Sequence, residues 1–321
     1  MKTVIKKYVK RSVLQLSIFA VVVIMFLIFI ILSPETFLSY NIYYAFMSTI
    51  PFTAILAISI TFIIILGEID LSFASVVGLC AFIYALVFKY VGNVYIGLIC
   101  SLLVGAIAGF LNGLFVLKVR IPSLIITLGM SFFWRGLVYI ISGGIGLSLV
   151  NTKPSVWYKL LVGRIAGVIP AQAVWLVLIT IFFAVILNYH RFGNHILFAG
   201  DNIESARMMG INVDRVKFTC FTQLGIVSAL VGMISSSEIV YVYPTAGSGY
   251  AVFIGGTSVY GGRGTIFGTL MGAIIIGSLE AGILSAGVEG FWIEFVYGIV
   301  IVVSLTLYSY LTRAGILRKL I

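Results

Sequence analysis

Apolar runs, each about as long as a membrane is thick, recur from one end of this chain to the other. The first covers residues 13–32, and comparable runs follow as far as residue 311. A helix needs about 20 mostly apolar residues to cross the hydrocarbon core of a bilayer. Residues 21–31 do not alternate between polar and apolar side chains, as a strand of a membrane β-barrel would. The chain is therefore predicted to be an all-α, polytopic membrane protein.

The charge balance agrees with this class. Only 9% of the residues are charged, whereas a soluble domain has roughly a quarter. The net charge of +10 raises the question of nucleic-acid binding. Lys and Arg collect in the cytoplasmic loops of membrane proteins, and no soluble basic domain is present here. We therefore expect the lipid bilayer as a partner and no nucleic acid.

Ten membrane-spanning helices are predicted within a single transmembrane domain, residues 1–321. They lie at residues 13–32, 42–66, 73–89, 94–117, 122–142, 172–189, 215–239, 250–259, 265–285 and 291–311. The run at 250–259 is short for a span. The longest polar connections are residues 143–171 and residues 190–214.

The basic residues predict the orientation of these helices. With the N-terminus in the cytoplasm, fifteen of the twenty Lys and Arg residues fall on the cytoplasmic side. This is the bias that the positive-inside rule describes. The count depends on residues 250–259 crossing the membrane, because a re-entrant segment there would invert the last two helices. We expect a multi-pass protein with both termini in the cytoplasm.

Two predicted helices carry glycines at every fourth position. The fourth helix has Gly105, Gly109 and Gly113, and the ninth has Gly264, Gly268 and Gly272. Such stripes let another helix approach closely. The two helices are predicted to run in opposite directions, as in an inverted repeat. Stripes of this kind are also common in membrane helices, so the repeat is left open.

A short polar segment on the basic side interrupts the apolar pattern. Asp201 and Glu204 resemble a capping box, Gly210 is a good helix stop, and Asn212 can cap the next helix. We predict a short helix that docks on a cytoplasmic partner; an ordinary ordered loop is the alternative. Its residues are Asn202, Glu204, Ser205, Ala206, Arg207, Met208, Met209 and Gly210.

Two carboxylates, Glu68 and Asp70, lie between the second and third helices with almost no loop around them. Ionisable groups near membrane depth are costly and usually face a cavity or a partner. Gly67 permits a break in the helix, and Asp70 or Ser72 can cap the helix that follows. The segment is therefore either a broken helix that lines a transport pathway or a tight turn before a capped helix.

No combination of residues predicts an enzyme. The two histidines, His190 and His195, lie in the polar segment, and no HExxH, CxxC or GxSxG motif occurs. The glycine-rich residues 255–264 lack the lysine and the preceding strand of a phosphate-binding loop. The three cysteines (80, 100 and 220) lie in apolar surroundings and are predicted to be core residues. We predict no catalytic, cofactor-binding or metal-binding residue.

Four motifs occur together over residues 40–311. They are Gly-Glu-Ile-Asp-Leu-Ser at 67–72, residues 121–129 with Arg135 and Gly136, residues 191–194 with 202–211, and residues 255–258 with 261–264. In this order they resemble the membrane-spanning permease subunits of bacterial ABC importers for sugars of the ribose, xylose and galactofuranose type. Glu68 departs from the usual second glycine. About two helical turns are missing between Tyr250 and Gly255.

The resemblance implies a permease without an ATPase of its own in the bacterial inner membrane. Two copies, or this chain and a paralogue, would form the pathway. Two ABC ATPase subunits, which bind ATP and Mg, would dock on residues 202–210, and an extracytoplasmic sugar-binding protein would deliver the substrate. The pathway candidates are Glu68, Asp70, Ser72, Pro122, Ser123 and Thr127, and Gly255 and Gly256 join the structural glycines.

Other functions stay open at this point. An ion-coupled secondary transporter would need an ion relay in the membrane, for which Glu68 and Asp70 are the candidates. A permease of the same superfamily could carry nucleosides, branched-chain amino acids or a sugar-derived signal. A non-transporting membrane scaffold is a third alternative. The chain itself does not reveal the substrate, because the binding protein usually sets selectivity.

Overall fold

A computed structural model describes residues 2–119, 121–248, 261–262, 264–289, 292–293, 295–299, 302 and 306, with only the backbone of residues 2–15 and 17. Helices dominate the described chain, which confirms the all-α class. By their contacts the residues form two compact units, unit 1 with residues 1–46 and 271–321 and unit 2 with residues 47–270. The single domain predicted for residues 1–321 stays a prediction.

Seven described helices are long and apolar enough to cross a membrane. They are α3 (Tyr40–Ile65), α4 (Phe73–Val91), α5 (Val94–Val119), α6 (Ser123–Ser142), α8 (Ala171–Tyr189), α11 (Val213–Ile239) and α12 (Ile266–Ser285). They lie where the second to seventh and the ninth helices are predicted, so the polytopic class is confirmed. The first predicted helix falls within α1 (Lys2–Leu32). Residues 250–259 lie outside the described residues, as does most of 291–311.

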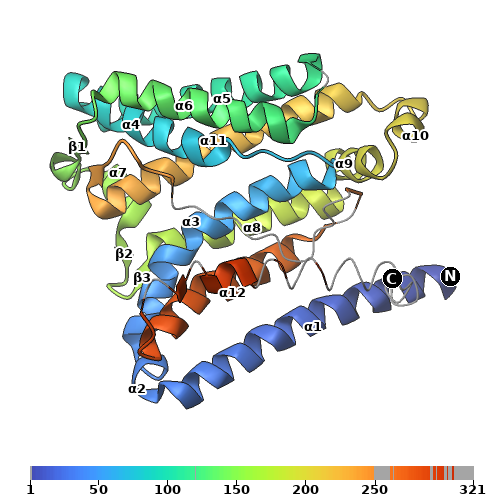
Figure 1. Ribbon diagram of the computed structural model, residues 1–321, viewed down its shortest axis with the longest axis horizontal. Coiled ribbons are helices and arrows are strands. Elements are labelled where there is room, and N and C mark those ends of the chain that lie inside the picture. Colours follow the sequence, from blue (N-terminus) through green and yellow to red (C-terminus); the bar gives the residue numbers. More distant parts are fainter. Residues whose placement is uncertain are drawn as a thin grey trace. The chain divides into compact units, whose positions relative to one another are not determined.

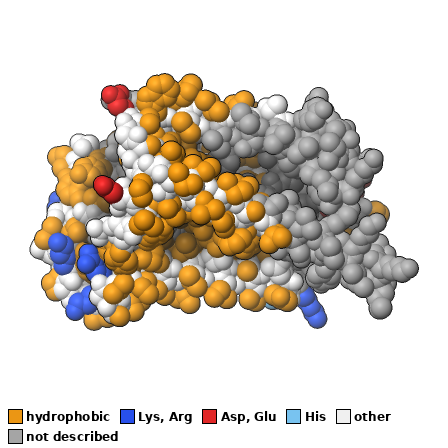
Figure 2. Space-filling model, turned by 90° about the horizontal axis from the view of Figure 1, so that it is seen from below, with side chains coloured by type: hydrophobic (Ala, Val, Ile, Leu, Met, Phe, Trp, Pro, Cys, Tyr) orange, Lys and Arg blue, Asp and Glu red, His pale blue; other side chains and the backbone are white. Residues whose placement is uncertain are grey.

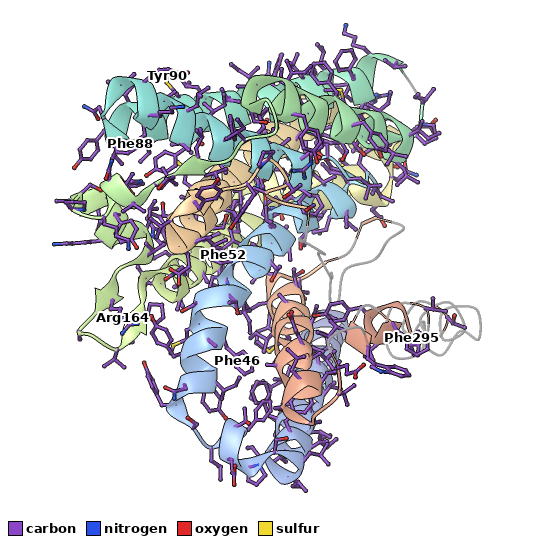
Figure 3. The ribbon with its side chains drawn as sticks, turned by 60° about the vertical axis from the view of Figure 1, so that its left-hand side comes forward. Phe46, Phe52, Phe88, Tyr90, Arg164 and Phe295 are labelled. Atoms are coloured by element: carbon purple, nitrogen blue, oxygen red, sulfur yellow. The ribbon has the colours of Figure 1, made fainter. Side chains whose placement is uncertain are left out.

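Aromatic rings hold the N-terminal part of unit 1 together. Phe37, on the short helix α2 (Pro34–Phe37), is fully buried, and its ring centroid lies 5.0 Å from that of Phe29 on α1. Phe46, labelled in Figure 3, lies 6.3 Å from Phe37 by the same measure. Aromatic pairs at such distances add to the stability that burial alone provides. This cluster joins α1, α2 and the start of α3.

The core of unit 2 is formed by α4, α5 and α11, each of which packs against the other two. The glycine stripe of α5 lies at the contact with α11. A Cβ atom on Gly105 would lie 2.4 Å from the carbonyl oxygen of Gly225, and one on Gly109 would lie 2.3 Å from that of Phe221. The close approach predicted for the fourth helix is therefore confirmed.

The other predicted structural glycines are less well defined. Gly113 of α5 also faces α11, where a Cβ atom would meet the Phe221 side chain at 3.1 Å. The roles of Gly264, Gly268 and Gly272 stay predictions. Gly255 and Gly256 lie outside the described residues.

Replacing Gly109 by leucine is expected to separate α5 from α11 and destabilise the protein. The added side chain has no space against the α11 backbone, and overpacking of this kind costs about 1–3 kcal/mol. Gly129→Leu on α6 is the matched control, since a Cβ atom there meets nothing within 4 Å. Thermal unfolding of both variants in detergent checks this. Equal midpoints for the two variants would contradict the packing argument.

Unit 2 has two distinct ends (Figure 1). One, here named the strand end, carries α7 (Val156–Val162) together with three two-residue strands and one 3₁₀ helix of the 143–171 connection. These are β1 (Leu147–Ser148), the 3₁₀ helix η1 (Val150–Thr152), β2 (Arg164–Ile165) and β3 (Ile169–Pro170). β2 pairs antiparallel with β3, and β1 pairs antiparallel with β4 (Tyr241–Val242). Arg164, on β2, marks this end in Figure 3.

The opposite end, here named the α10 end, carries α9 (Arg191–Asp201), α10 (Ile203–Met208) and the connection from α3 to α4 (Figure 1). The chain changes ends between β4 and residue 262. Val242 pairs with Leu147 at the strand end, whereas the Gly262 amide donates to the Ile65 carbonyl at 2.7 Å at the α10 end. Gly247, the residue three positions before the predicted short helix, already lies against Ala74 in the first turn of α4, so the ten-helix count stays a prediction.

Apolar side chains cover most of the described surface, and few charged side chains interrupt it (Figure 2). Among the seven long helices, α6 and α8 are the least buried, with only 17% and 28% of the most apolar window buried. A soluble protein would not expose so much apolar surface. Cys80 and Cys220 are buried, as predicted, and Cys100 is partly exposed.

Candidate functional site

The polar segment between α8 and α11 forms two helices rather than one. The predicted helix after residue 202 is present as α10, but α9 before it was missed. The His190 Nδ1 atom accepts a hydrogen bond from the Phe192 amide at 3.1 Å and caps α9. Gly193, Ile196 and Ala199 are buried at every third position of α9. This helical spacing is the sequence signal that could have revealed it.

The capping box predicted from Asp201 and Glu204 is wrong. Asp201 is the last residue of α9, so its backbone is helical and it cannot begin the next helix. Asn202 is the cap instead, and its Oδ1 atom accepts from the Ser205 amide at 2.8 Å. Glu204 lies in the first turn of α10, where a negative charge is favourable.

A short turn joins α10 to α11. Gly210 has a φ of +81°, and its amide donates to the Arg207 carbonyl at 2.9 Å. The Ile211 amide donates to the Ala206 carbonyl at 3.0 Å. Asn212 Oδ1 then accepts from the Arg215 amide at 2.9 Å and caps α11. Both the stop at Gly210 and the cap at Asn212 are confirmed.

The outer side of α10 carries adaptable apolar groups. The side chains of Met208 and Met209 are 83% and 57% exposed, whereas Ala206 is fully buried. Arg207 pairs with Asp214 of α11 at 3.3 Å across the turn. Methionine suits contact surfaces because its flexible, polarisable side chain fits irregular partners.

A cleft of about 420 Å³ separates α10 from the connection between α3 and α4. It is lined by Leu66, Gly67, Glu68, Ala199, Gly200, Asp201, Asn202, Ile203 and Glu204. Beside it, α9 meets α3 so closely that a Cβ atom on Gly200 would lie 1.8 Å from the Ile65 carbonyl oxygen. The fold thus brings the two predicted site segments next to each other.

The connection from α3 to α4 begins with the predicted break. α3 ends at Ile65, and Gly67 turns the chain with a φ of +75°. The Glu68 carboxylate then forms an ion pair with the Nζ atom of Lys217 on α11. The two side chains are only 16% and 12% exposed, and they lie 149 residues apart in sequence. No local signal could have predicted this pair.

Asp70 is buried and caps α4. Its Oδ1 atom accepts from the Ser72 amide at 2.7 Å and from the Ser72 hydroxyl at 2.6 Å. The Ser72 hydroxyl accepts from the Asn112 side-chain amide at 2.6 Å, and Asn112 Oδ1 accepts from Trp134 Nε1 at 3.0 Å. Ser72 occupies the N-cap position without a capping bond of its own, and Asp70 supplies the acceptor for its amide. The hydrogen bonds tie the start of α4 to α5 and α6.

This carboxyl group has an unusual environment. Burial raises the pKa of Asp70 to about 6, although the hydrogen bonds from Ser72 and Asn112 act in the opposite direction. Removing the carboxylate from water penalises its charged form. Perturbed carboxyl groups are typical of functional sites, and structural networks also produce them.

The start of α6 holds the same segment from the other side. Ser123 Oγ accepts from the Ile69 amide at 2.9 Å, and Thr127 Oγ1 accepts from the Leu71 amide at 3.1 Å. Thr127 also donates to the Ser123 carbonyl at 2.8 Å. These bonds satisfy backbone groups of a segment that has no regular secondary structure, as a buried segment requires.

The six pathway candidates therefore gather at the α10 end. These residues differ in exposure. Four are buried, namely Asp70, Ser72, Ser123 and Thr127, whereas Glu68 is partly buried and Pro122 is exposed. The geometry is that of a capped helix after a tight turn. The assignment of these residues to a transport pathway stays a prediction. Asn112, Trp134 and Lys217 were missed, since each acts through a partner on another helix.

Arg135 holds a second irregular segment. Its Nη1 atom donates to the carbonyls of Pro244 at 3.3 Å and Ala246 at 2.6 Å. A Cβ atom on Gly78 of α4 would lie 2.3 Å from the Ala246 carbonyl oxygen. Residues 244–246 thus lie between α4 and α6. In membrane proteins such backbone is tolerated where it is buried in protein or lines a polar cavity.

Comparisons with known proteins give consistent results. The family model described as branched-chain amino acid transport system / permease component matches residues 42–305. The autoinducer 2 import system permease protein of Photorhabdus luminescens is 31% identical, covering 78% of this chain and 76% of its own length. That of Klebsiella pneumoniae is 30% identical, covering 98% and 90%. The ribose import permease protein of Escherichia coli is 32% identical, covering 85% and 87%. No solved structure matches the chain.

Proposed function

Because this chain belongs to the family of branched-chain amino acid transport system permease components, we propose that it works as the permease subunit of an ATP-binding-cassette importer. The position of α10 carries this proposal. An exposed helix, joined by a short turn to a long apolar helix, lies beside the break between two other such helices. That arrangement is suited to passing a movement from a partner into the bundle.

The proposed substrate is a sugar. Support comes from the relative of 32% identity that is named a ribose import permease protein. Other relatives are named autoinducer 2 import system permease proteins, so autoinducer 2 is the alternative substrate.

We propose the partners from the relatives, which are named import permease proteins. No described group of three or more His, Cys, Asp or Glu side chains can hold a metal ion. In the proposed importer, ATP and Mg are bound by ABC ATPase subunits that dock on α10. An extracytoplasmic sugar-binding protein delivers the substrate, and a second permease copy or a paralogue completes the pathway. The α10 end and both termini then lie in the cytoplasm of a bacterium.

The secondary-transporter alternative needs a carboxylate that is free to exchange protons or ions. Glu68 is engaged by Lys217, and Asp70 is enclosed by Ser72 and Asn112. Glu68 is therefore not placed as an open relay, which supports an external energy source.

Uptake into proteoliposomes is expected to require ATP, the ATPase subunits and the binding protein together. The chain would supply only the pathway and the docking helix. The measurement is the accumulation of radiolabelled ribose and of other small sugars, with ATP or with an imposed proton or sodium gradient. Solute movement driven by the gradient alone, or by the purified chain without companions, would overturn the proposed function.

A further inference from the structure

The ion pair between Glu68 and Lys217 joins the connection from α3 to α4 to the beginning of α11. Glu68 lies on the connection from α3 to α4 and lines the cleft opposite α10. Lys217 lies just over one turn into α11, which follows α10 directly. Both side chains are largely buried, so the pair is shielded from solvent and from salt.

On one side of the pair, a closed turn joins α10 to α11. The Gly210 turn is closed by hydrogen bonds to Arg207 and Ala206, and Asn212 caps α11 immediately afterwards. A displacement of α10 must therefore displace the first turns of α11. Lys217 is carried with them.

On the other side, Glu68 leads into backbone that is held by two further helices. The Ile69 and Leu71 amides donate to Ser123 and Thr127 of α6. Through Ser72 the same segment reaches Asn112 of α5. A displacement of Glu68 is therefore passed to the starts of α4 and α6.

We propose that Glu68 and Lys217 are positioning residues that transmit the movement of α10 to the start of α4 during transport. This inference rests on the proposed function. The proposed function assigns the ATPase contact to α10, and this inference adds the residues that pass the movement of α10 to α4.

A purely stabilising role predicts different behaviour from a transmitting role. Replacing both members of a buried ion pair by neutral side chains of similar size is often neutral or stabilising, whereas removing one member leaves an unpaired buried charge. A double variant, Glu68→Gln with Lys217→Met, should therefore fold well. It would nevertheless lack the ion pair that joins α11 to the segment between α3 and α4.

The experiment measures uptake per ATP hydrolysed in proteoliposomes that contain the complete importer. Glu68→Gln with Lys217→Met is expected to keep its thermal stability and its ATP hydrolysis but to lose about fivefold in uptake per ATP. The charge-exchanged variant, Glu68→Lys with Lys217→Glu, is expected to recover to within about twofold of the wild type, since it restores the pair. Each single charge reversal should lose about tenfold.

Lys118→Met is the matched control, because Lys118 is an exposed lysine at the end of α5 at the same end of the unit. It should leave uptake per ATP unchanged. Wild-type uptake per ATP in the neutral double variant would overturn the inference and leave a structural role. Failure of the charge exchange to recover more than either reversal, with the protein folded, would also overturn it. Absence of ATP-dependent uptake in the wild type would instead count against the proposed function.

Discussion

Asp70→Ala is expected to reduce substrate uptake by about tenfold or more. The substitution removes the acceptor for the Ser72 amide and hydroxyl, and both donors are buried. A buried donor left unsatisfied costs about 1–3 kcal/mol, and 1.4 kcal/mol is a factor of ten in an equilibrium. The loss also removes the terminal acceptor of the chain of hydrogen bonds that runs from Trp134 through Asn112 and Ser72 to Asp70. The start of α4 would no longer be fixed against α5 and α6.

Glu68→Ala is expected to be less harmful, with uptake reduced a few-fold. The Lys217 side chain that it leaves unpaired is 12% exposed, and its flexible stem can bring the amine towards water in the adjoining cleft. Initial uptake rates of both variants, normalised to the amount of protein in the membrane, check this order. Asp70→Asn is the informative control, because its amide oxygen can still accept from Ser72. Wild-type rates for both alanine variants would refute a role for this segment in transport.

Gly210→Pro is expected to uncouple ATP hydrolysis from uptake while leaving membrane insertion intact. Proline fixes φ near −65°, whereas Gly210 has a φ of +81° and donates its amide to Arg207. The turn between α10 and α11 would have to open. We expect a loss of about tenfold in uptake per ATP, which is within the range of coupling energies between distant sites. The membrane-spanning helices keep their apolar surfaces, so insertion should not change.

Glu204→Ala tests the same docking helix without altering its turn. It removes a negative charge from the first turn of α10 and from the wall of the cleft, so a smaller uncoupling is expected. Gly210→Asn is the control for the turn, because asparagine tolerates positive φ better than other side chains. The measurements are uptake, ATP hydrolysis and membrane abundance of each variant. Normal uptake by both Gly210→Pro and Glu204→Ala would remove the assignment of residues 202–210 as a docking helix.

The helices could be located from the sequence because each one is marked by its own continuous run of apolar residues. A run such as residues 42–66 must be helical in a bilayer, whatever surrounds it, since its backbone groups have no other partners there. Single residues that end or cap a helix could also be recognised in the sequence. Gly67, Gly210 and Asn212 act in the structure as their residue types predicted.

Predictions from short sequence patterns failed where contacts with residues distant in sequence decide the local structure. Asp201 looked like a cap, but α9 continues through it because Ile196 and Ala199 are buried and hold the helix in place. Gly105 and Gly109 were recognised as close-packing positions, yet their partner, α11, could not be named.

Hydropathy and short-range motifs alone therefore predicted a polytopic helical protein, the break after α3 and the close-packing positions Gly105 and Gly109. Tertiary packing decided which polar groups meet: Glu68 with Lys217, Ser72 with Asn112, and the 69–71 backbone with Ser123 and Thr127. The physical reason is that burial and periodicity are properties of a single segment. A hydrogen bond or an ion pair between segments exists only after the helices have taken their places beside one another.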